Sequence, residues 1–154
     1  MEIADLLTPE SVIAHLKVSS KKQALHELAK HAAERTGFHE RAIFDVLLAR
    51  EKLGTTGVGN GIAIPHGKLP VVERPFGLFA RLDHPIDFDS VDGVPVDLIF
   101  LLLASESAGA DHLKALARVS RLLRDYGTCE KLRGTDGAEA LYALLTESTS
   151  TRAA

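Results

Sequence analysis

The sequence of 154 residues is poor in cysteine, in basic runs and in long apolar runs, and each shortage excludes a class of protein. Its single cysteine, Cys129, excludes an intrachain disulfide and a cluster of thiolate metal ligands, which suits a reducing cytoplasm. The longest apolar run, residues 98–104, is far below the roughly 20 residues that a membrane-spanning helix requires. No basic run exceeds the pair Lys21-Lys22, so a polybasic membrane anchor is not expected.

Charge and composition narrow the choice further. The chain carries 18 basic and 21 acidic residues, and this net charge of -3 lacks the electrostatic footprint of a nucleic-acid binder. Acids stand near the first residue, where an export signal would carry positive charge, so we expect a cytoplasmic protein without membrane insertion. Its 45% hydrophobic and 25% charged residues are typical of a globular chain. We predict one domain over residues 1–147 and a flexible tail over residues 148–154.

Two helices are predicted in the first third of the chain. Ser20 and Gln23 have the spacing of a capping box, which predicts a helix over residues 20–36. A second helix is predicted over residues 39–52, with an apolar stripe facing inward. Arg50 falls on the edge of that inward face, which is an unusual place for a guanidinium group.

The rest of the chain alternates between strand and helix patterns. Three strands are predicted, over residues 62–64, 76–82 and 96–103; the last is apolar almost throughout, as expected of a central strand covered on both faces. Later helices are predicted from an N-cap at Asp111 and from Asp136. The pattern favours an α/β sandwich, a small mixed sheet with helices on both faces.

A glycine-rich segment separates the second helix from the first strand, but it fits neither common nucleotide-binding motif. Gly57, Gly59 and Gly61 follow a helix and precede a strand, the reverse of a dinucleotide fingerprint. The spacing from Gly61 to Gly67-Lys68 is one residue too long for a P-loop, and no Ser or Thr follows. The simpler interpretation is that these glycines allow a tight, irregular turn.

His66 is the most informative residue of this region. Pro65 biases Ile64 toward extended geometry, and Gly67 gives the chain freedom to turn away, which would hold the imidazole at the rim of a sheet. Sites in α/β folds gather at such rims, and a neutral imidazole is a competent nucleophile. The alternative is a structural histidine with all its hydrogen bonds satisfied.

Further residues favour a site for a transferable phosphoryl group. Arg50 offers a planar set of donors for phosphoryl oxygens, and His112 is expected at the first turn of a helix, where an anion is stabilised. Thr55, Thr56 and Asn60 are candidate phosphate-binding groups in the loop. The alternatives are a structural salt bridge for Arg50, a surface position for His112 and ordinary turn chemistry for the other three.

Two stretches resemble a known family. Residues 50–68, which include Gly-Thr-Thr-Gly-Val-Gly-Asn-Gly and Ile-Ala-Ile-Pro-His-Gly-Lys, closely resemble the active-site signature of fructose/mannitol-type enzyme IIA domains of the bacterial phosphotransferase system. Residues 111–123, beginning Asp-His-Leu-Lys, match a second stretch. The resemblance covers residues 3–146 and is strongest to the nitrogen-regulatory branch. Ala104-Ser105 replaces the Ala-Pro often seen after the central strand, which affects the expected shape of that loop only.

The resemblance implies a function and partners. His66 matches the histidine that is phosphorylated by an HPr-like carrier, and Arg50 and His112 match the residues that flank it. It implies a phosphocarrier without a cofactor or metal, whose targets are regulatory proteins such as kinases or transporters. The alternative is a sugar-transport component that passes the group to an enzyme IIB, although a domain standing alone favours the regulatory branch.

Two other classes of protein remain possible from the sequence. One is a purely binding module that regulates a kinase or transporter without phosphoryl transfer. The other is a metalloenzyme that uses His66 and His112, but the sequence offers no convincing third ligand and lacks the close histidine spacing of zinc motifs.

Overall fold

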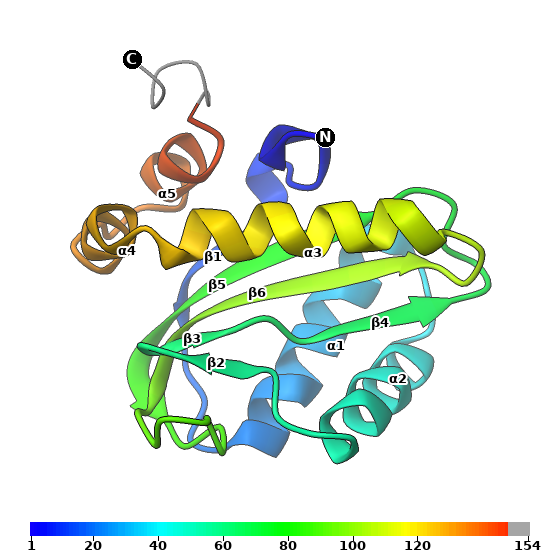
Figure 1. Cartoon of the computed structure of the whole chain (residues 1–154), viewed down its shortest axis with the longest axis horizontal. Helices are drawn as coiled ribbons and strands as arrows, with labels where there is room; N and C mark the ends of the chain where they lie inside the picture. Colours follow the sequence, from blue (N-terminus) through cyan, green and yellow to red (C-terminus); the bar gives the residue numbers. More distant parts are fainter. Residues whose placement is uncertain (148–154) are drawn as a thin grey trace.

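The computed structural model describes residues 1–147, so the predicted tail of residues 148–154 lies outside the described residues. A mixed sheet of six strands lies between two layers of helices (Figure 1). The strands are β1 (Val12–Leu16), β2 (Gly57–Gly59), β3 (Ile62–Ala63), β4 (His66–Leu69), β5 (Phe76–Ile86) and β6 (Val96–Ser105). The helices are α1 (Lys21–Thr36), α2 (Glu40–Lys52), α3 (Gly109–Arg124), α4 (Tyr126–Arg133) and α5 (Ala138–Leu145), and two short 3-10 turns, Ile3–Asp5 and Pro9–Ser11, precede β1. The predicted α/β sandwich is confirmed.

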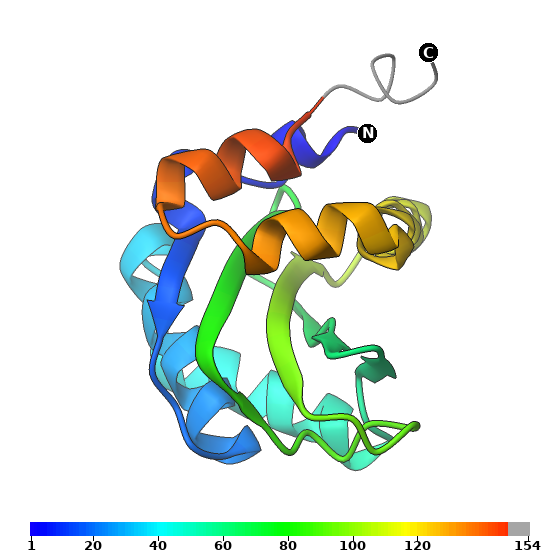
Figure 2. The same ribbon diagram turned by 90° about the vertical axis from the view of Figure 1, so that its left-hand side faces the viewer.

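Strand β6 organises the sheet. It pairs antiparallel with β5 on one side and parallel with both β3 and β4 on the other, in the order β1-β5-β6-β3-β2. Residues 98–104 of this strand are all buried, which confirms the prediction of a central strand covered on both faces. Helices α1 and α2 cover one face of the sheet and α3, α4 and α5 cover the other, each over its own hydrophobic cluster (Figures 1 and 2).

The predicted start of α1 is half right. The Ser20 hydroxyl accepts a hydrogen bond from the Gln23 amide at 3.1 Å, as an N-cap should. The Gln23 side chain accepts from the amide of Ser19 at 2.7 Å, one residue earlier than a capping box requires. The helix ends at Gly37, whose φ of 79° is the left-handed conformation that glycine adopts without steric cost.

The path of the chain around His66 corrects the sequence prediction. Gly67 does not turn the chain away: His66 begins β4, and the strand continues to Leu69 beside β6. His66 therefore lies at the interruption between β3 and β4, opposite Leu102, at the start of a strand that, within residues 1–147, pairs only with β6 and not at the end of a strand. A Cβ atom on Gly67 would stand 2.1 Å from Cγ1 of Val46, so this glycine allows α2 to approach the strand closely.

Helix α3 begins earlier than predicted. Its N-cap is Ala108, and Asp111 is the third residue of the helix. The sequence pattern also predicts an inward face of Leu113, Leu116, Ala117, Ser120 and Leu123. This prediction is wrong for Leu113, which is 67% exposed, and right for Leu123, which is buried. Since successive helical residues differ by about 100° in direction, the buried stripe is displaced by one position. It consists of His112, Ala115, Val119, Leu122 and Leu123.

Three strands and one helix escaped prediction: β1, β2, β4 and α4. The first three are short or glycine-rich, so they lack a readable alternation of apolar and polar residues. The last helix begins at Ala138 with Gly137 as its N-cap, later than predicted, and the Asp136 carboxylate contacts the His15 ring at 2.6 Å. No helix within residues 1–147 is both long and apolar enough to span a membrane.

Candidate functional site

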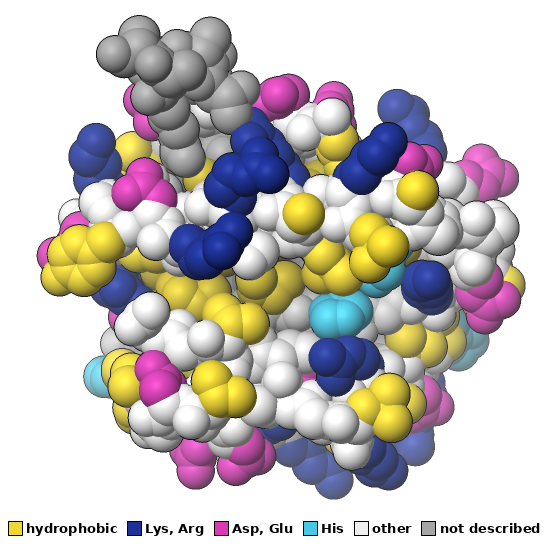
Figure 3. Space-filling view, in the orientation of Figure 1, with side chains coloured by type: hydrophobic (Ala, Val, Ile, Leu, Met, Phe, Trp, Pro, Cys, Tyr) yellow, Lys and Arg dark blue, Asp and Glu magenta, His cyan; other side chains and the backbone are white. Residues whose placement is uncertain are grey.

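The C-terminal end of α2, the start of β4 and the first half of α3 meet around a cavity of about 600 Å³. Its lining includes Val46, Arg50, Leu53, His66, His112 and Leu113. On this face of the molecule histidine side chains lie among hydrophobic side chains, with a basic side chain beside them (Figure 3). A half-open, largely apolar cavity with a few polar groups is the usual form of a binding site.

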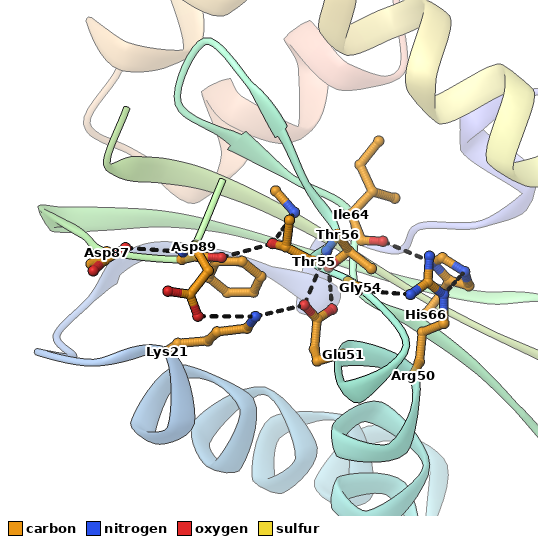
Figure 4. Close-up of polar contacts among 12 residues, drawn as sticks. Lys21, Arg50, Glu51, Gly54, Thr55, Thr56, Ile64, His66, Asp87 and Asp89 are labelled. Carbon is orange, nitrogen blue, oxygen red and sulfur yellow. Dashed lines mark hydrogen bonds and ion pairs between the residues drawn. The ribbon is translucent and has the colours of Figure 1, made fainter. Parts of the chain in front are cut away.

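The hydrogen bonds of His66 fix its tautomer. Its Nδ1 lies 2.9 Å from the carbonyl oxygen of Ile64, which can only accept a hydrogen bond, so Nδ1 carries the proton. In the neutral ring Nε2 then holds a lone pair. That nitrogen accepts a hydrogen bond of 3.2 Å from Nε of Arg50, as Figure 4 shows. The nitrogen available for nucleophilic attack is therefore Nε2.

Burial keeps His66 in this neutral form. Desolvation lowers the pKa of the imidazole, and the positive charge of Arg50 lowers it further. The hydrogen bond to Ile64 and the negative charge of Glu51 act in the opposite direction without reversing the shift. At neutral pH the ring is consequently uncharged and keeps its lone pair on Nε2.

Arg50 brings an unneutralised positive charge to this nitrogen. Its Nη1 donates to the carbonyl oxygen of Gly54 at 2.8 Å, while its Nε donates to His66. Within residues 1–147 Arg50 makes no ion pair, so the alternative of a structural salt bridge is wrong. The guanidinium group has donors left for an anion that arrives beside His66.

His112 faces His66 from α3. The ring centroids lie 5.5 Å apart with an angle of 54° between the planes, and His112 is only 6% exposed, so its interpretation as a surface residue is wrong. Burial lowers the pKa of His112. The positive charge that His66 carries when it is protonated and the charge of Lys68 lower it further. Its Nδ1 is buried without a hydrogen-bond partner among the described residues. The neutral ring is therefore best served by a proton on Nε2, since a buried N–H without an acceptor costs free energy.

The three loop residues predicted to bind phosphate are engaged elsewhere. The Thr55 hydroxyl donates to the carbonyl oxygen of Phe88 at 2.7 Å, and the Thr56 hydroxyl donates to the Glu51 carboxylate. Asn60 occupies the turn between β2 and β3, where its backbone N–H donates to the Asp92 carboxylate at 2.9 Å. None of the three is among the residues that line the cavity over His66.

Sequence reasoning missed Glu51 and Lys21. Glu51 follows Arg50 directly in the chain, and its side chain is only 3% exposed. It forms an ion pair of 3.0 Å with Nζ of Lys21 (Figure 4). A signal was present, because Glu51 lies four residues after the buried Leu47 and therefore on the inward face of α2. Within residues 1–147 no three His, Cys, Asp or Glu side chains are grouped so that they could hold a metal ion.

The fold and the site together define a class of protein: an α/β sandwich with a histidine that is neutral at its Nε2 and lies between a cation and a second imidazole. The family model described as "Phosphoenolpyruvate-dependent sugar phosphotransferase system, EIIA 2" matches residues 5–148. The chain belongs to this family and is a phosphotransferase system component of the enzyme IIA type.

Known relatives agree with this assignment. The chain is 67% identical over 145 residues to a nitrogen regulatory protein of Bradyrhizobium diazoefficiens, covering 94% of this chain and 95% of the relative. It is 40% identical to a nitrogen regulatory protein of Klebsiella oxytoca, with 97% and 93% covered. The crystal structure of the nitrogen regulatory protein IIA-Ntr from Neisseria meningitidis superimposes with a TM-score of 0.88 at 36% identity, with 94% of this chain and 99% of that chain covered.

Proposed function

We propose that the chain is a regulatory phosphocarrier that accepts a phosphoryl group on Nε2 of His66 from an HPr-like phosphocarrier protein. One observation supports this most strongly. The neutral imidazole directs its lone pair at the Nε–H of Arg50, a cation that no carboxylate neutralises within residues 1–147. Phosphoryl transfer depends mainly on positioning and on offsetting negative charge, and a nucleophile beside an available positive charge can supply both.

The proposed transfer exchanges one N–P bond for another. The lone pair of Nε2 attacks the phosphorus atom of the donor's phosphohistidine, and the electron pair of the breaking N–P bond returns to the donor imidazole. His66 gains positive character on its ring as the new bond forms. Its Nδ1–H stays hydrogen-bonded to the carbonyl oxygen of Ile64, which stabilises that charge. The Ile64 carbonyl thereby selects the attacking nitrogen and supports its product.

Arg50 and His112 are assigned to the phosphoryl oxygens. Once Nε2 bonds to phosphorus it can no longer accept from Arg50, so the guanidinium N–H groups become free to donate to the oxygens. His112 approaches from the other side of the cavity and offers its Nε2–H as a neutral donor. Fixed donors of this kind offset the negative charge that is spread over the equatorial oxygens.

The surroundings of His66 suit a protein donor. Leu53 is 84% exposed and Leu113 is 67% exposed, and both line the cavity that contains the imidazole. Exposed apolar side chains around a polar centre are typical of protein interaction surfaces. In this arrangement a carrier protein covers the leucines and delivers its phosphohistidine to His66.

The relatives favour the regulatory branch over the sugar-transport branch. Both reported sequence relatives carry the name nitrogen regulatory protein, one of them at 67% identity over nearly the whole of both chains. The expected targets are regulatory proteins such as kinases or transporters, and the alternative target is an enzyme IIB. Since phosphoenolpyruvate is formed and used in the cytoplasm, the proposed reaction implies that the chain acts there.

The proposal is tested by labelling. The protein is incubated with enzyme I, an HPr-like carrier and phosphoenolpyruvate, and the phosphate is located by mass spectrometry. We expect one phosphoryl group on His66, stable in alkali and lost in mild acid. His66→Ala should abolish labelling, whereas His84→Ala, which removes an exposed histidine on β5, should not affect it. Full labelling of His66→Ala would refute the proposal.

A further inference from the structure

We propose that Glu51 is a positioning residue that holds Arg50 and His66 in their reactive geometry; this inference rests on the proposed function. Glu51 is the residue after Arg50 in the last turn of α2. One of its carboxylate oxygens accepts from the Thr56 amide at 3.0 Å, and the other accepts from the Thr56 hydroxyl. The carboxylate therefore ties the end of the helix to the segment that leads into β2.

A second set of bonds continues from Thr56 to the nucleophile. The Thr56 carbonyl oxygen accepts from the Ile64 amide at 3.0 Å. The Ile64 carbonyl oxygen then accepts from Nδ1 of His66 at 2.9 Å. Figure 4 shows these residues side by side. Glu51 is thus joined covalently to Arg50 and, through Thr56 and Ile64, to the group that sets the tautomer of His66.

A carboxylate is an unfavourable choice for mere packing at this position. The C-terminal end of a helix carries partial negative charge, which disfavours an anion, and burial adds a desolvation cost. The ion pair with Lys21, whose ammonium group also lies 4.8 Å from the centre of the Phe88 ring, offsets part of this cost. Apolar residues often replace buried ion pairs without loss of stability. We therefore assign to Glu51 the positioning of Arg50 and His66, and not a gain in stability.

The contact between Arg50 and His66 is sensitive to small shifts of either residue. The Arg50 Nε–H bond to Nε2 of His66 is already 3.2 Å long, near the upper limit for a nitrogen donor. If the loop at Thr56 moved relative to α2, this contact and the Ile64 bond would both lengthen. Misplacement of reacting groups by about 1 Å costs on the order of a hundredfold in rate, so a partial loosening should slow transfer about tenfold.

The test compares two variants that weaken the hydrogen bonds between Glu51 and Thr56 with a matched control. Glu51→Gln removes the charge at nearly constant shape, and Thr56→Val removes only the hydroxyl. Asp45→Asn removes a carboxylate of the same helix that is 57% exposed and pairs with Arg41 on the surface. Labelling rates are measured below the unfolding midpoint of every variant, and the tautomer of His66 is read from its ring ¹⁵N chemical shifts.

We expect Glu51→Gln and Thr56→Val to label about tenfold more slowly and to lose part of the Nδ1–H tautomer, with Thr56→Ser restoring both. Asp45→Asn should match the wild type. A lower unfolding midpoint with unchanged rate and tautomer would show that Glu51 is only structural. If Glu51→Gln does not fold, Thr56→Val decides alone. Failure of the wild type to label would refute the proposed function, while the tautomer would still test Glu51.

Discussion

Two arginines donate hydrogen bonds to backbone carbonyl oxygens of the same glycine-rich segment, but in the described part of the chain only one of them also pairs with a carboxylate. Arg50 donates to the carbonyl oxygen of Gly54, and Arg133 donates to that of Asn60. Nε and Nη2 of Arg133 also donate to the Asp97 carboxylate, at 2.9 and 3.0 Å. This pairing with Asp97 raises the pKa of the guanidinium group. Arg50 has no such carboxylate within residues 1–147 and contacts an uncharged imidazole instead.

The contrast shows what identifies a site in this molecule. Arg133 also borders a cavity, of about 400 Å³, which includes Cys129. In that cavity the charge of Arg133 is neutralised by Asp97. Burial raises the pKa of the Cys129 thiol, which keeps the thiol in its unreactive protonated form. A guanidinium group without a carboxylate partner, beside a neutral imidazole, distinguishes the cavity over His66 from the cavity beside Arg133.

The largest expected effect separates the two arginines directly. Arg50→Lys keeps the charge but loses the planar pair of donors, so we expect phosphorylation of His66 to slow by about tenfold to a hundredfold. The thermal midpoint should hardly change, because Arg50 makes no ion pair within residues 1–147. The measurement is the initial labelling rate together with the thermal midpoint.

Arg133→Lys is the matched control for this experiment. It should lower the free energy of unfolding by about 2 kcal/mol, since one of the two donors to the Asp97 carboxylate is lost, and leave the labelling rate of the folded protein unchanged. An equal loss of rate in both variants would break the contrast drawn between the two arginines.

A smaller effect on the labelling rate is expected from substitution of His112. It tests whether a neutral donor contributes to transfer in addition to the charge of Arg50. His112→Leu removes its N–H group from the cavity and should slow labelling about tenfold, the value of one donor to a charged oxygen. His112→Gln retains an N–H donor and should keep more of the rate. Identical rates in the two variants would show that the ring contributes only by packing.

The smallest effects are shifts in titration, and they compare His66 with His15. Burial lowers the pKa of His66, whereas the hydrogen bond to Asp83 and the charge of Asp136 raise the pKa of the exposed His15. Their NMR titration midpoints should therefore fall on opposite sides of the ordinary value of about 6.5. Arg50→Met should move the His66 midpoint upward and leave His15 in place.

These shifts also give the sign of the pH dependence of stability. Because the unfolded chain binds the His66 proton more tightly, the stability gained by keeping this ring neutral is present above pH about 6.5 and is lost as the pH falls toward the folded pKa. His15 acts in reverse, and its contribution is lost as the pH rises through its raised pKa. Denaturant titrations of His66→Gln and His15→Gln between pH 5 and about 8 should show opposite slopes relative to the wild type.

The sequence predicted the elements whose pattern is local and strong. Helix α1, with its Ser20 cap, and the wholly apolar β6 were readable because periodicity and capping need no tertiary information. His66, Arg50 and His112 were predicted as site residues from their chemistry and from the family resemblance. The structure brings all three to one cavity, and their roles stay predictions.

What the sequence could not supply was the result of long-range pairing. Strands β1 and β4 are recognisable only through their partners β5 and β6. The buried Glu51 depends on Lys21 in another helix, and the hydroxyls of Thr55 and Thr56 are used by Phe88 and Glu51. The contacts of Glu51 with Lys21 and of Thr55 with Phe88 join residues far apart in the chain, so a local pattern does not record them.

The most direct test of the account is to determine which nitrogen carries the phosphate. Protein labelled with ¹⁵N and phosphorylated through the carrier chain is examined by NMR for the ring shifts and the phosphorus coupling of His66. The hydrogen bond between Nδ1 and the carbonyl oxygen of Ile64 predicts phosphorus on Nε2. Phosphorus on Nδ1, or on any residue other than His66, would contradict the account.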